Sequence, residues 1–122
     1  MHGTKRYTIV RNGVIGGKPR ETTHKCGSPG TKRYPYRVTL TVRGNLTGPD
    51  YFIVDNREVD DYVQAVFVRN RFGMSCERMC DEMLNCLHDM LSNYPQWTAE
   101  RIHVELTGTN GAAWLSAEWT AA

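Results

Sequence analysis

The sequence contains no apolar run close to the roughly 20 residues that a membrane-spanning helix needs. Its basic start, residues 1–6, is followed by no apolar segment, so no secretory signal is predicted. Internal repeats are lacking, and a content of 40% apolar and 23% charged residues excludes a disordered or collagen-like chain. With only 122 residues, the chain is too short for a two-domain enzyme. We therefore expect a single domain over residues 1–122.

Cysteine is scarce, and its placement does not suggest secretion. Three of the four cysteines, Cys76, Cys80 and Cys86, fall in one predicted helix. Cys76 and Cys80 lie one turn apart while Cys86 points elsewhere, which is a poor disulfide framework. We therefore expect reduced thiols and a cytoplasmic protein.

Acidic residues are almost absent from the first third of the chain. Residues 1–45 hold ten Lys and Arg and one acid, a net charge of +9, whereas residues 46–122 hold five Arg and twelve acids, a net charge of −7. Such asymmetry favours a partner for the first third that is phosphate, nucleic acid or an acidic protein surface. Alternatively, the two parts neutralise each other within or between subunits.

Periodicity predicts strands before two helices. Residues 7–10 alternate weakly and run into Asn12-Gly13, which is typical of a hairpin turn. Residues 16–35 have no period and predict a long basic loop, and residues 36–43 alternate as the clearest strand. A further apolar strand is expected at residues 51–54.

Capping residues mark both helices. Asp55, with Glu58 three positions later, predicts the start of the first helix, and Ser75 predicts the start of a second that runs to about Asn93. A hairpin over residues 102–119 follows. The expected fold is α+β, an antiparallel sheet with two consecutive helices on one face, in the order β–β–β–α–α–β–β.

Two weak chemical sites involve cysteine. His24 and Cys26, with Cys76 and Cys80, could bind a metal, but structural zinc sites usually show paired CxxC-type motifs, which are missing here. Cys26 could instead be a nucleophile, because nearby cations lower a thiol pKa. Core thiols and an ordinary loop cysteine are the simpler interpretations, so we expect no bound cofactor.

Basic and aromatic residues alternate just before and within the clearest strand. This cluster consists of Lys32, Arg33, Tyr34, Tyr36 and Arg37. Cations for phosphates and rings for stacking are the two parts of a single-strand nucleic-acid surface. A solvated face of the sheet would have the same pattern.

Glu105 lies mid-strand on the face opposite the apolar residues, followed by Thr107. A strand carboxylate beside hydroxyls and exposed backbone can hold an N–H/NH2 edge such as that of guanine or a pterin. A solvated strand residue is the alternative.

From His24 to the C-terminus, the order of these features resembles the pyruvoyl- and carboxy-tetrahydropterin synthases, which share the tunnelling fold (T-fold). The similarity lies in a His-x-Cys before a Tyr-Arg-Val-Thr-Leu-Thr-Val strand, a Gly-Pro-Asp-Tyr-Phe-Ile-Val-Asp segment and an Ile-His-Val-Glu-Leu-Thr strand. The resemblance implies a homo-oligomer with ligand pockets between subunits. It carries over Cys26 to a nucleophile-like position and Glu105 to a ligand-anchoring position.

The chain departs from the family at its catalytic residues. The family binds zinc through three histidines, two of them in a His-Gly-His before the central strand, where this chain has no histidine at residues 30–35. The Asp-His pair expected between the helices is also missing at residues 67–74. The resemblance therefore implies binding without the family's chemistry.

Three functions remain open. The first is a non-catalytic oligomer that binds a nucleotide- or pterin-like ligand, with Glu105 at the base edge and Lys32, Arg33 and Arg37 at phosphate. The second is a small accessory or inhibitor protein, as in phages and mobile elements, whose basic third binds nucleic acid or a nucleic-acid enzyme. The third is a divergent enzyme that uses Cys26.

Overall fold

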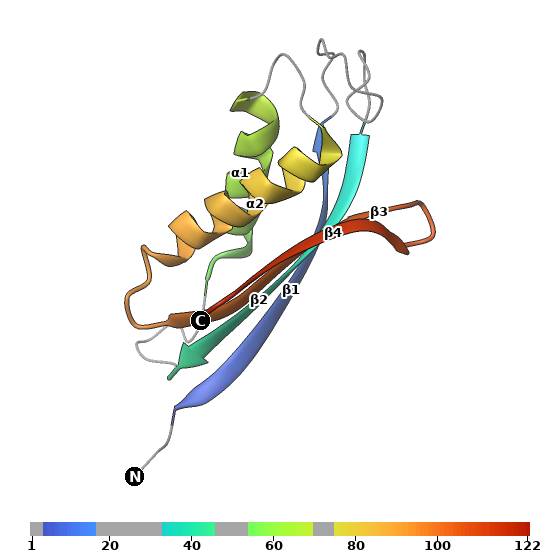
Figure 1. Cartoon of the computed structure of the whole chain (residues 1–122). Coiled ribbons are helices and arrows are strands. Elements are labelled where there is room, and N and C mark those ends of the chain that lie inside the picture. The colour runs from blue at the N-terminus through green and yellow to red at the C-terminus, as the bar shows by residue number, and fades with distance from the viewer. Residues whose placement is uncertain (1–3, 17–32, 46–53, 70–74) are drawn as a thin grey trace.

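In the computed structural model, two helices lie on the same face of a four-stranded antiparallel sheet (Figure 1). The structure describes residues 4–16, 33–45, 54–69 and 75–122. The elements in chain order are β1 (Lys5–Gly16), β2 (Arg33–Gly44), α1 (Asn56–Arg69), α2 (Cys76–Leu91), β3 (Thr98–Thr107) and β4 (Ala113–Thr120). The strands follow one another across the sheet in the order β1-β2-β3-β4. The predicted α+β architecture, with both helices on one face, is confirmed.

The order of elements differs from the prediction before the first helix. The structure gives β–β–α–α–β–β, because residues 51–53 of the expected third strand lie outside the described residues and Val54 lies in a bend before α1. Both ends of the segment expected to be a loop, residues 16–35, belong to strands, since β1 includes Gly16 and β2 begins at Arg33. Residues 17–32 lie outside the described part of the chain.

The predicted turn at Asn12-Gly13 is wrong, because β1 continues straight through it. Asn12 pairs with Arg37 and Gly13 pairs with Tyr36 on the neighbouring strand. A Cβ atom at Gly13 would collide with the ring and hydroxyl of Tyr36. The glycine therefore permits the close approach of a tyrosine side chain. In the sequence, a glycine with this role looks the same as a turn glycine.

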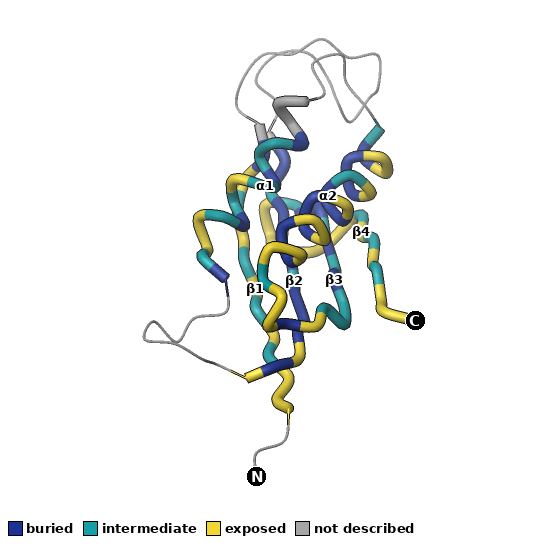
Figure 2. Tube along the Cα trace, turned by 90° about the vertical axis from the view of Figure 1, so that its left-hand side faces the viewer, coloured by how far each residue is buried: buried dark blue, intermediate teal, exposed yellow. Residues whose placement is uncertain are grey.

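Alternating apolar residues of the two central strands form the core with the helices. Tyr36, Val38, Leu40 and Val42 of β2 are all buried, as the period of two predicts. On α2, the predicted stripe is also buried, and it consists of Met79, Met83, Leu87, Met90 and Leu91. Figure 2 shows the buried segments of β2, β3 and α2 concentrated between the sheet and the helices.

Side-chain caps fix the starts of both helices. The Asp55 carboxylate accepts a 2.8 Å hydrogen bond from the Arg57 amide, and the Ser75 hydroxyl accepts one from the Arg78 amide. Glu58, expected to complete a capping box, instead accepts a hydrogen bond from the Tyr94 hydroxyl. The second helix ends at Leu91, two residues before the predicted end.

The cysteines of α2 differ in state. Cys80 and Cys86 are buried and form no disulfide, whereas Cys76 is disulfide-bonded. The prediction of reduced thiols is therefore wrong for Cys76. Within the described residues, no helix has the length and apolar character needed to cross a membrane.

Candidate functional site on the uncovered sheet face

The sheet face opposite the helices carries polar side chains from all four strands. Both helices pack on the other face, so no described helix covers this one (Figure 1). We call the residues that interact across it the polar belt, and they are Asn12 of β1, Arg37 of β2, Arg101, His103 and Glu105 of β3, and Glu118 of β4.

Glu105 lies at the centre of the polar belt. The Arg37 Nη1 atom lies 2.8 Å from Glu105 Oε2, and the His103 Nε2 atom lies 3.0 Å from Glu105 Oε1. The Glu105 side chain is only 17% exposed. Hydrogen bonds that involve a charged group are short and strong, so these two contacts hold both carboxylate oxygens of Glu105 in place.

Arg37 connects Glu105 with two further elements. Its Nε atom donates to Asn12 Oδ1 over 3.2 Å, and its Nη2 atom donates to the Gly111 carbonyl over 3.1 Å. Gly111 has a φ of 80°, a conformation that glycine adopts without strain in the β3–β4 turn. The guanidinium therefore ties the central carboxylate to β1 and to the hairpin turn.

His103 links the two carboxylates of the polar belt. Its Nδ1 atom lies 3.1 Å from Glu118 Oε1, and the same oxygen accepts a 2.6 Å hydrogen bond from Arg101 Nε. The hydrogen bond from Arg101, and then that from His103, hold the pKa of Glu118 below its usual range. Only the imidazolium form of His103 can donate to Glu105 and Glu118 together, because neutral imidazole has one N–H.

The structure separates the two tyrosines from Glu105. Tyr34 and Tyr36 are 3% and 2% exposed and belong to the core under the helices. The Tyr36 hydroxyl donates to Asp60 of α1 over 3.2 Å, and burial, followed by the charge of Asp60, raises its pKa. Of the predicted ligand-binding residues, Arg37 and Glu105 are brought together.

The other predicted site residues are only partly described. Thr107 is buried at the end of β3, beside an irregularity in its pairing with β4. Arg33 begins β2. The remaining positions, His24, Cys26 and Lys32, lie outside the described residues.

Part of the charge asymmetry of the sequence is neutralised within the described part of the chain. Four arginines of the first third form ion pairs with acids of the later two thirds. These pairs are Arg6–Glu100, Arg11–Asp60, Arg37–Glu105 and Arg43–Glu100. This arrangement supports the interpretation that the two parts of the sequence neutralise each other within a subunit.

The described residues do not form a metal site. Among them, no group of three His, Cys, Asp or Glu side chains is placed to hold a metal ion. In the polar belt, the two nitrogens of His103 face different carboxylates. The zinc of the tetrahydropterin synthases therefore has no matching ligand set within this part of the chain.

The sequence interpretation missed His103 and Glu118. Neither residue was given a role from the sequence, yet His103 contacts both carboxylates of the polar belt. A spacing of two residues puts His103 on the same face as Glu105, and this signal could have identified it. Glu118 depends on the β3–β4 register, where it lies opposite His103, and the sequence does not specify that register.

The fold has a known structural counterpart. It matches the structure of Caenorhabditis elegans 6-pyruvoyl tetrahydropterin synthase with a TM-score of 0.52 and 11% sequence identity, over the full length of both chains. No protein-family model and no curated protein sequence matches the chain. At this identity the match establishes the fold alone, which is a T-fold-like arrangement.

Proposed function

We propose that the protein is a non-catalytic, oligomeric binder of a nucleotide- or pterin-like ligand, with Glu105 as the residue that receives the ligand's ring edge. The observation that carries the proposal is the fixed carboxylate of Glu105 on the uncovered sheet face. Arg37 and His103 each engage one of its oxygens. A carboxylate has about four lone-pair sites, so each oxygen retains acceptor capacity for a ligand N–H.

The geometry of Glu105 supports the proposed ligand class. Two adjacent carboxylate oxygens match a planar edge with two parallel N–H groups, such as the N–H and NH2 of guanine or a pterin. Because Arg37 and His103 already hold the carboxylate, binding loses less side-chain entropy than it would with a free glutamate. The T-fold-like architecture, seen also in a tetrahydropterin synthase, supports the same ligand class.

Two sequence features support binding without catalysis. The chain lacks the family's His-Gly-His at residues 30–35 and its Asp-His pair at residues 67–74. Cys26 alone of the family's reactive positions has a counterpart in the sequence, and a cysteine without acid–base partners is a poor catalyst. A reducing cytoplasm suits the free thiol of Cys80, whereas the disulfide at Cys76 suits an oxidising compartment.

Nucleic-acid binding by the basic third is the less favoured function. Arg6, Arg37 and Arg43 on β1 and β2 are already paired with carboxylates, so phosphates would have to displace Glu100 and Glu105. The contribution of Lys32 to either function stays a prediction, since it lies outside the described residues.

Isothermal titration of the protein with guanosine triphosphate and with neopterin tests the proposal. We expect Glu105→Gln to weaken binding by about 1–3 kcal/mol, because a ligand N–H loses a charged acceptor. Glu100→Gln is the matched control, because it removes another β3 carboxylate that pairs with arginines. Circular dichroism melts confirm that both variants fold. No binding of either compound, or equal binding by wild type and Glu105→Gln, would contradict the proposal.

A further inference from the structure

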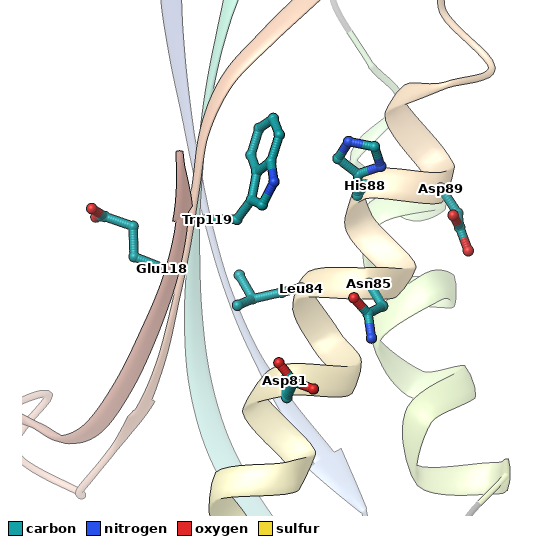
Figure 3. A pocket seen from close by; sticks show the side chains of 7 residues that line it. All are labelled: Asp81, Leu84, Asn85, His88, Asp89, Glu118 and Trp119. Atoms are coloured by element: carbon teal, nitrogen blue, oxygen red, sulfur yellow. The ribbon is translucent and has the colours of Figure 1, made fainter. Parts of the chain in front are cut away.

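The imidazole of His103 lies between two carboxylates on the uncovered face of the sheet. Its Nε2 atom is 3.0 Å from Glu105 Oε1, and its Nδ1 atom is 3.1 Å from Glu118 Oε1. Figure 3 shows Glu118 extending from β4 away from α2, whereas its neighbour Trp119 extends toward the helix. Since Glu118 lies opposite His103 in the β3–β4 register, the three polar side chains form a row of carboxylate, imidazole and carboxylate.

The two carboxylates differ in how the oxygen that faces His103 is held. Glu118 Oε1 also accepts a 2.6 Å hydrogen bond from Arg101 Nε. Among the described residues, Glu105 Oε1 has His103 as its only partner, because Arg37 contacts the other oxygen, Oε2. The position of Glu105 Oε1 therefore depends on His103, whereas that of Glu118 Oε1 does not.

The charge of His103 decides whether both contacts can exist at once. Neutral imidazole has one N–H and one lone pair, so it donates to one carboxylate and directs a lone pair at the other. A lone pair on Nδ1 would face the Glu118 oxygen that Arg101 holds in place. A lone pair on Nε2 would face the Glu105 oxygen, which is free to turn away. The neutral ring therefore keeps its N–H on Glu118 and loses Glu105.

His103 is the group of the polar belt that changes charge near neutral pH. Histidine ordinarily titrates between about pH 5 and 8, whereas carboxyl and guanidinium groups titrate outside this range. Across the sheet, His103 faces Thr39 of β2 and then Val10 of β1, both uncharged. The charged side chains around it all belong to the polar belt, namely Arg37, Arg101, Glu105 and Glu118.

We infer that His103 is the positioning residue of Glu105, whose carboxylate the imidazolium form holds ready for a ligand and the neutral form releases. The consequence for binding rests on the function proposed above. With His103 neutral, Glu105 keeps only Arg37, on one oxygen. A ligand must then restrict the released side chain, which costs entropy. Binding at Glu105 therefore weakens as the pH rises from about 5.5 to 8.

Side-chain carbon relaxation in NMR spectra of the full chain tests the positioning role without any ligand. We expect the Glu105 side chain to become more mobile between about pH 5.5 and 8, with the same midpoint as the His103 ring titration. The Glu118 side chain should keep its order, because Arg101 still holds it. In His103→Gln, the pH-dependent change at Glu105 should disappear. A Glu105 side chain with equal order at both pH values, or loss of order at Glu118 instead, overturns the inference.

Isothermal titration with guanosine tests the consequence for binding, since guanosine has no phosphate that titrates in this range. We expect wild type to bind about 3- to 10-fold more weakly at pH 8 than at pH 5.5, as loss of one preorganised side chain implies. His103→Gln should bind equally at both pH values. His88→Gln is the matched control and should keep the wild-type pH dependence. This histidine meets Trp119 in a groove of about 560 Å³ between β4 and α2, on the other face of the sheet (Figure 3).

The two measurements separate the positioning role from the proposed function. Equal or tighter guanosine binding by wild type at pH 8 overturns the inference. Absence of guanosine binding at both pH values contradicts the assignment of Glu105 to a ligand's ring edge. The relaxation of Glu105 in the ligand-free protein then still decides whether His103 positions this carboxylate.

Discussion

Arg37 and Glu105, 68 residues apart in the chain, face each other across β2 and β3 with 2.8 Å between Nη1 and Oε2. The arginine also donates to Asn12 and to the Gly111 carbonyl, so one side chain joins the central strands to β1 and to the hairpin turn. Removing it leaves a carboxylate that is only 17% exposed without its principal partner.

We therefore expect Arg37→Ala to reduce the free energy of unfolding by about 1–3 kcal/mol, as measured by urea denaturation. Arg57→Ala is the control, because the Arg57 side chain is 88% exposed and its ion pair with Asp55 is a surface contact. Equal midpoints for Arg37→Ala and wild type would show that the ion pair contributes nothing to stability.

The Arg11–Asp60 pair predicts how stability changes with acid. Arg11 donates to both Asp60 oxygens over 3.0 and 2.7 Å, and these hydrogen bonds hold the pKa of Asp60 below its usual range. A depressed pKa in the folded state stabilises the protein above the unfolded pKa, near 3.9, and that stabilisation is lost as the pH falls further. Asp60→Asn should be less stable than wild type at pH 7, and the difference should shrink toward pH 2. Thermal melts across this range measure it, and a constant difference would contradict the linkage.

Because Gly13 lies so close to Tyr36, we expect one added methyl group at position 13 to lower the free energy of unfolding strongly. Gly13→Ala would push the Tyr36 ring away from Asp60 and from the core, so we expect a loss of about 1–3 kcal/mol in urea denaturation. Gly108→Ala is a suitable control, since its nearest neighbour would be the Asn110 side chain at 3.3 Å. If both variants were equally stable, the close approach at Gly13 would not be limiting.

Because the cysteines of α2 are buried, we expect a thiol there to react slowly with an alkylating reagent. Desolvation, followed by the charge of Glu77, raises the pKa of Cys80 to about 11. At pH 8 little thiolate exists, and thiolate is the reactive form. Mass spectrometry after iodoacetamide treatment should therefore find Cys80 unmodified in the folded protein and modified in urea. Rapid labelling of the folded protein at this position would show that α2 opens readily.

Periodicity and capping predicted the helices and the later strands well. The stripe on α2 and the alternation on β2 depend on burial of apolar residues at fixed intervals, which a sequence records directly. The turn at Asn12-Gly13 was predicted wrongly because a glycine that admits a neighbouring side chain has the same local signature as a turn glycine. The contact with Tyr36 distinguishes Gly13 from a turn glycine. This contact forms across the pairing of β1 with β2, which no local sequence pattern specifies.

The candidate site was predictable only where it depends on alternation. Glu105 was singled out because it lies on the strand face opposite the apolar residues, whereas Arg37 was singled out as a member of the basic and aromatic cluster that begins at Lys32. The placement of Tyr34 and Tyr36 in the core follows from the same alternation, although their charged neighbours suggested a ligand surface. The link from His103 to Glu118 requires the register of β3 against β4, which depends on the turn and the irregularity near Thr107.

The polar belt also bears on how the chain selects one strand alignment among several. Apolar alternation distinguishes the two faces of a sheet, so it penalises a slip by one residue. A slip by two residues preserves the faces and leaves the apolar pattern satisfied. In the polar belt, the same slip would separate Arg37 from Glu105 and His103 from Glu118 together. The ionic contacts on the uncovered face thus favour one alignment of β2, β3 and β4, whereas hydrophobic burial alone does not distinguish it from an alignment shifted by two residues.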